Sequence, residues 1–109
     1  MPFTDEQALN LYIESVSTEA KAHVCSRYAE GFAAEFAARY DKWRRANADA
    51  LARGAQLAEA RGMNAPTPPN LKTFASMNAQ VLEALPEDDR QRRCNELLSF
   101  LLTAQRNER

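Results

Sequence analysis

The sequence predicts an all-α protein, folded as a small helical bundle in one domain. Apolar residues recur at helical spacing, and the 58-residue stretch from Thr4 to about Arg61 contains neither a proline nor a competing strand pattern. The chain has 109 residues, of which 45% are apolar, and this is enough for one core. As one straight helix, Thr4–Arg61 would be roughly 85–90 Å long. A domain of this size has a radius of gyration of only about 13 Å. The stretch must therefore break, or project and meet a partner.

The beginning of the first helix is marked by Thr4, which is followed three residues later by Gln7 in the pattern of a capping box. Ser17 is the best candidate for a break, because it could cap a new helix. Gly31 and Asn47 are two further candidates. We expect a short first helix and then a long second helix that ends at the glycine of Arg61-Gly62-Met63.

Three segments follow from these signals. Residues 1–62 form the N-terminal helices, residues 63–69 form a proline-rich loop, and residues 70–109 form a C-terminal helical hairpin. Pro86 ends the first helix of this hairpin, and the acidic residues 87–89 begin its second helix, where acids favour the helix dipole. We expect the hairpin to pack back on the long helix.

An aromatic stripe is the sharpest pattern in the chain, because its members follow one another at spacings of four, four, four and three. One interpretation is a platform on which nucleic-acid bases stack, since basic residues flank the end of the stripe. The helical period favours a packed core instead. The predicted core consists of Tyr28, Phe32, Phe36, Tyr40, Trp43, Phe74, Leu97, Leu98 and Leu101.

The charge distribution suggests an interaction surface. The net charge of −1 gives no global signature of nucleic-acid binding. Residues 1–35 are mainly acidic, however, and residues 39–53 are mainly basic, so two antiparallel copies would pair opposite charges. The alanine-rich stretch 46–60 buries little area by itself, and we therefore expect an antiparallel homodimer of long helices. The candidate interaction residues are Arg39, Lys42, Arg44, Arg45 and Arg53.

The residue types that carry chemistry are scarce. His23 and Glu19 lie one turn apart, but two ligands are too few for a tight transition-metal site. Cys25 and Cys94 do not belong to a CxxC motif, and we expect both to be reduced and buried, with a disulfide between the first and last helices as the alternative. We therefore predict no catalytic residue, no metal and no cofactor.

The sequence contains no apolar run of the length that a signal peptide or membrane span requires, and this favours the cytoplasm. Arginine outnumbers lysine eleven to three and alanine is abundant, which is typical of a bacterial source. We expect a non-enzymatic protein–protein interaction module, such as a small bacterial adaptor, chaperone, immunity protein or regulator. The alternative is a nucleic-acid-binding regulator that uses the basic stretch of the long helix.

Overall fold

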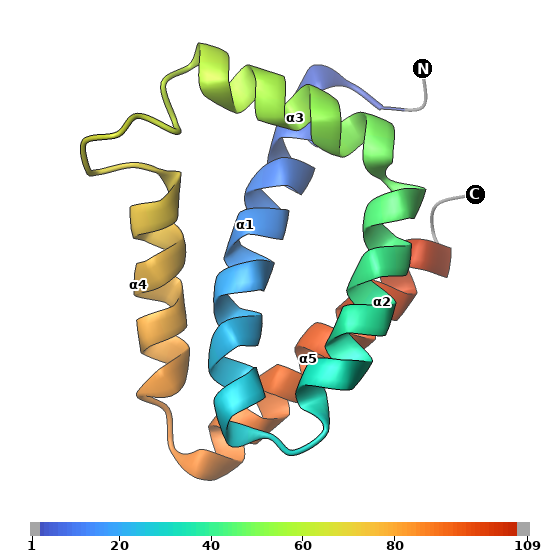
Figure 1. The fold of residues 1–109 in the computed structure, drawn as a ribbon, viewed down its shortest axis with the longest axis vertical. Helices are drawn as coiled ribbons and strands as arrows, with labels where there is room; N and C mark the ends of the chain where they lie inside the picture. The colour runs from blue at the N-terminus through green and yellow to red at the C-terminus, as the bar shows by residue number, and fades with distance from the viewer. Residues whose placement is uncertain (1–2, 107–109) are drawn as a thin grey trace.

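The computed structural model describes residues 3–106, with side chains up to residue 102; the ends of the predicted segments at residues 1–2 and 107–109 lie outside it. Within the described residues the chain forms five helices and no strand (Figure 1), so the all-α prediction is confirmed. The helices are α1 (Asp5–Tyr28), α2 (Phe32–Ala46), α3 (Ala48–Ala60), α4 (Leu71–Glu83) and α5 (Glu87–Arg106).

The prediction of a short first helix is wrong, because α1 is 24 residues long and does not break at Ser17. Its N-terminus has the predicted capping box, in which Thr4 accepts from the amide of Gln7. The neighbouring Ser15 donates its hydroxyl to the carbonyl of Tyr12 at 2.6 Å, as serines do inside a helix. The break comes at Gly31, where φ is +80° and a glycine is favoured.

The predicted long second helix is two helices, which are divided at Asn47. This residue is 4% exposed, and its side-chain amide donates to the carbonyl of Trp43 at 2.8 Å. Its backbone conformation, with φ −115° and ψ 21°, is not helical. The buried amide thus satisfies a carbonyl at the end of α2 while the chain changes direction into α3.

The predicted stop at Gly62 is confirmed. Gly62 has φ +73°, and the amides of Gly62 and Met63 donate back to the carbonyls of Glu59 and Ala58, at 3.1 and 2.9 Å. This is the pattern of a Schellman motif. The loop then leads to Asn70, whose side chain accepts from the amide of Thr73 at 2.9 Å and caps α4.

The helices form a thin molecule, with extents of 39 × 37 × 18 Å. Helix α1 lies between α4 and α2, α3 crosses one end of α1, and α5 crosses behind α2 (Figure 1). Helix α4 packs mainly on α1 and α5 mainly on α2, so the predicted hairpin is not a packed pair. The corner at Pro86 instead sends the two helices to different neighbours.

Helix α3 packs closely against α1 at Gly54. A Cβ atom at this position would lie 2.2 Å from the carbonyl oxygen of Ala8, so only glycine permits this approach. Ala50 and Ala58 are buried on the same side of α3. One side of the alanine-rich stretch that motivated an antiparallel dimer of long helices, the side with Ala50 and Ala58, is therefore covered within one chain.

The core is built around the aromatic stripe. Trp43 is fully buried, and the rings of Phe32, Phe36, Tyr40 and Trp43 are stacked with centroids 5.6, 4.9 and 5.6 Å apart. Leu101 is buried beside Trp43 and Tyr40. Of the predicted core residues, Phe32, Tyr40, Trp43 and Leu101 are buried, while Phe36, Leu97 and Leu98 are half-buried against it.

The assignment to the core is wrong for two residues. Tyr28 is 49% exposed, because it lies in the last turn of α1. One face of its ring is covered by the guanidinium of Arg90, 4.0 Å from the ring centroid. Phe74 is 56% exposed, because it lies on the side of α4 that faces away from α1. Helix α4 buries small residues against α1 instead, namely Ala75 and Ala79 together with Leu82.

Candidate interaction surfaces

The predicted basic interaction residues are distributed over α2 and α3, and most of them are engaged within the chain. Arg39 is half-buried, donates to the carbonyl of Leu98 at 3.2 Å and pairs with Glu35. Arg45 pairs with Asp41 at 2.8 Å one turn earlier.

Arg53 makes a bidentate contact with Asp5, with two N–O distances of 3.0 Å. The hydrogen bond from Arg53 is the main cause that lowers the pKa of Asp5. Arg44 lies 5.9 Å from the centroid of the Tyr40 ring, and Lys42 is exposed. The structure therefore does not gather the five cations into one uncompensated positive face.

A broad groove of about 1130 Å³ is bordered by α1, α2, α3 and the proline-rich loop. Its charged lining residues carry both signs: Arg44, Arg45 and Lys72 against Glu19 and Asp41. Beneath it the Tyr40 hydroxyl donates to Glu19 at 2.6 Å, and burial followed by this bond raises the pKa of Tyr40. Tyr40 therefore keeps its proton at neutral pH and acts as a hydrogen-bond donor, not as a base.

His23 is exposed on α1 and lines a second groove, of about 740 Å³, between α1 and α4. Both residues of the sequence pattern, His23 and Glu19, line this groove. Within the part of the chain that the structure describes, no group of three histidine, cysteine or acidic side chains is placed to hold a metal ion.

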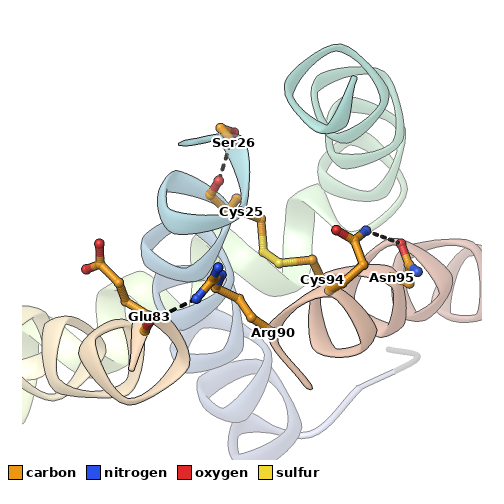
Figure 2. The surroundings of a disulfide bond; sticks show 8 residues. Cys25, Ser26, Glu83, Arg90, Cys94 and Asn95 are labelled. Carbon is orange, nitrogen blue, oxygen red and sulfur yellow. Dashed lines mark hydrogen bonds between the residues drawn. A yellow bond between two sulfur atoms is a disulfide. The ribbon is translucent and has the colours of Figure 1, made fainter. Parts of the chain in front are cut away.

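The prediction of reduced cysteines is wrong, because Cys25 of α1 and Cys94 of α5 form a disulfide (Figure 2). Their Cα atoms are 5.8 Å apart, although 69 positions separate them in the sequence. Both residues are buried, at 0% and 1% exposure. The bond connects the end of α1 to the first half of α5.

A polar network lies beside the disulfide, where the ends of α1 and α4 meet the start of α5. Arg90 donates to the backbone carbonyl of Glu83 at 3.3 Å (Figure 2). It also donates to the backbone carbonyl of Leu85 at 3.1 Å. The Glu83 carboxylate accepts from the Tyr28 hydroxyl at 2.8 Å and pairs with Arg27 at 3.0 Å. The hydrogen bond from Tyr28 is the main cause that lowers the pKa of Glu83. This corner therefore joins the ends of α1 and α4 to the start of α5.

Helix α4 carries the largest group of apolar side chains that the fold leaves exposed. Phe74, Met77 and Val81 are 56%, 54% and 65% exposed, and their spacing of three and four places them on one side of the helix. On α5, Phe100 and Leu102 are 36% and 39% exposed. We refer to Phe74, Met77, Val81 and Phe100 as the apolar face.

A groove of about 440 Å³ lies beside these residues, between α4 and α5. Val81 and Leu85 of α4 form one apolar side, and Leu97 and Phe100 of α5 form the other. The charged residues at this groove are Glu14, Lys21, Arg93 and Glu96. An apolar centre with charges around it is the usual anatomy of a protein interface.

This surface was not predicted from the sequence, because Phe74 was assigned to the core. A usable signal was present, since the apolar residues of α4 cover a wide arc of the helix: small ones at positions 75 and 79, and large ones at 74, 77 and 81. An apolar arc of this width needs cover from more than one neighbour. Helix α4 has one main neighbour, α1, and this neighbour takes the side with the small residues.

Comparison of the chain with protein-family models, with curated proteins and with solved structures finds no match. Among the described residues, none of the helices combines the length and the apolar character that crossing a bilayer requires.

Proposed function

We propose that this protein is a non-enzymatic helical protein–protein interaction module, a small adaptor, chaperone, immunity protein or regulator of bacterial origin. The observation that carries the proposal is the exposure of Phe74, Met77 and Val81, three large apolar side chains on one side of α4. Single exposed apolar residues are common on protein surfaces, but a contiguous set beside a groove is typical of an interaction site.

The shape of the molecule supports the same proposal. Its accessible surface is 7153 Å². A folded monomer of 12.2 kDa is expected to expose about 6,100 Å². The radius of gyration, 14.4 Å, also exceeds the roughly 13 Å expected for this length. The thin arrangement of helices leaves more surface in water than an isolated domain of this size usually does, and much of the exposed apolar part lies on α4.

The alternative, a nucleic-acid-binding regulator, has weaker support. Arg39, Arg45 and Arg53 each pair with a carboxylate of the same chain, which would have to be displaced by phosphate. Retention on DNA at several salt concentrations tests this alternative. Electrostatic binding through these cations would fall steeply as salt rises, and the interaction-module proposal expects little retention at any salt concentration.

We also propose that the protein resides in an oxidising compartment and not in the cytoplasm that we predicted. Buried disulfides persist where thiols are not continuously reduced, and the Cys25–Cys94 bond is shielded from solvent. Acid quenching of the cells, followed by alkylation of free thiols under denaturing conditions and mass measurement, tests the compartment. Unmodified Cys25 and Cys94 support it, and alkylation of both residues contradicts it.

Site-specific photo-crosslinking in the source cells tests the function. A photoreactive amino acid at position 77 is expected to give adducts of discrete mass. The same probe at position 76 serves as the matched control, since Ser76 is exposed on the same helix but lines the groove on its other side, and it is neither three nor four residues from Phe74, Met77 or Val81. Absence of adducts from position 77, or equal adducts from both positions, would argue against an interaction module that uses this face.

A further inference from the structure

The occupant of the apolar face can be inferred from its geometry and charge; this inference rests on the proposed function. Phe74, Met77 and Val81 form a ridge along α4, and the α4–α5 groove lies directly beside that ridge, because Val81 belongs to both. A ridge next to a groove allows each of two identical surfaces to insert its ridge into the groove of the other. This is the arrangement that a two-fold dimer requires.

The charges at the groove fit a second copy of the same surface. Glu14 and Glu96 supply two acidic groups, and Lys21 and Arg93 supply two basic groups, so the rim is neutral as a whole. Each helix that contributes to the rim, α1 and α5, carries one charge of each sign. A surface of balanced charge can face its own copy without net repulsion, whereas a partner of strong single-sign charge would find no complement here.

The area available also fits a second copy. The accessible surface of 7153 Å² exceeds the expectation for a monomer by about 1,000 Å². A stable dimer of standard size buries about 800 Å² on each partner. The surface that the whole chain exposes beyond this expectation is therefore about as large as one such contact.

We propose that the apolar face of α4 and the α4–α5 groove bind the same surface of a second copy, which gives a two-fold homodimer. This dimer differs from the antiparallel pair of long helices that the sequence suggested. Its interface excludes α3, whose buried residues Ala50, Gly54 and Ala58 face α1. The basic residues Arg44 and Arg45 line the separate groove between α1, α2 and α3 and stay in solvent.

Sedimentation velocity over a wide range of protein concentration tests the dimer. The wild-type chain is expected to reach twice the 12.2 kDa chain mass. Val81→Arg places a charge at the centre of the interface, and the dissociation constant should rise at least about 30-fold, the effect of a single hot-spot residue. Ser76→Arg adds the same charge on the other side of α4, at the groove between α1 and α4, and should leave the dimer intact.

Folding of both variants is checked by circular dichroism, because residues 76 and 81 are exposed and should tolerate arginine. Met77→Cys with a short bifunctional thiol reagent gives a second measurement, in which a covalent dimer supports the proposed contact. A wild-type chain that is monomeric at every concentration overturns the second copy. A dimer that Val81→Arg does not weaken overturns this surface. In either case, discrete photo-crosslinks from position 77 to other proteins would still support the interaction-module function.

Discussion

Removal of the Cys25–Cys94 disulfide is expected to destabilise the protein strongly. The bond closes a loop between residues that are 69 positions apart. In the chain-entropy account, a loop of about this length restricts the unfolded chain by roughly 15 cal/mol/K, or about 4 kcal/mol at 25 °C. For a domain of about this size, about 4 kcal/mol corresponds to a fall in Tm of roughly 15–20 °C.

Thermal unfolding followed by circular dichroism, with and without reductant, measures this effect. Cys25→Ala combined with Cys94→Ala should reproduce the low Tm of the reduced protein, and reductant should not change the Tm of this double variant. Two outcomes would refute the reasoning: a shift of less than about 5 °C on reduction, or two reactive thiols in the denatured but unreduced protein. The second outcome would also restore the prediction of reduced cysteines.

Three further predictions concern the packing and the charges of the monomer. Gly54→Ala should destabilise the protein by about 1–3 kcal/mol in urea unfolding, because the new Cβ would lie 2.2 Å from the Ala8 carbonyl oxygen. This overpacking outweighs the gain in helix propensity. A stabilised variant would contradict the close approach of α3 to α1. Trp43→Ala, at a fully buried position, should lower the free energy of unfolding by about 3–5 kcal/mol. Phe74→Ala, at an exposed position, should change the free energy of unfolding of the monomer by no more than about 0.5 kcal/mol. Equal effects would contradict the assignment of core and surface. The pKa values of Asp5 and Glu83 are lowered in the folded state, so these carboxylates stabilise the fold above their ordinary pKa values of 3.8 and 4.5. This stability is lost as pH falls through the folded-state pKa values, and Asp5→Asn with Glu83→Gln should therefore flatten the acid limb of a Tm–pH profile. An unchanged limb would show that these ion pairs do not contribute.

The ends of helices were predictable where one residue type has one strong local preference. Thr4 with Gln7, Gly62 and Pro86 mark such ends, and the structure has a helix start or stop at each of them. The break between α1 and α2 was not placed correctly, because serine at position 17 and glycine at position 31 can each mark a helix end or lie inside a helix. Packing decides between them: buried Thr18 and Ala22 continue the face of α1 beyond Ser17.

The side of each helix that is buried was harder to predict. The spacing of the aromatic stripe identified Phe32, Tyr40 and Trp43 as core, since one helix face can hold all of them. For α4, however, periodicity does not say whether the large or the small apolar side meets α1. Close packing of α1 against Ala75 and Ala79 leaves Phe74 outside, and this choice depends on tertiary geometry. The pairing of Cys25 with Cys94 is likewise invisible in their spacing, because it requires the end of α1 to meet the first half of α5.

Hydrogen–deuterium exchange at low and high protein concentration tests the central claim most directly, since it reports which surface becomes protected when copies meet. We predict added protection at high concentration in α4 and in the part of α5 around Leu97 and Phe100. Amides of α3 should exchange equally under both conditions. Protection confined to α3 and α2 would contradict this dimer and would support the pairing of long helices instead. The absence of any concentration dependence would contradict a second copy on the apolar face.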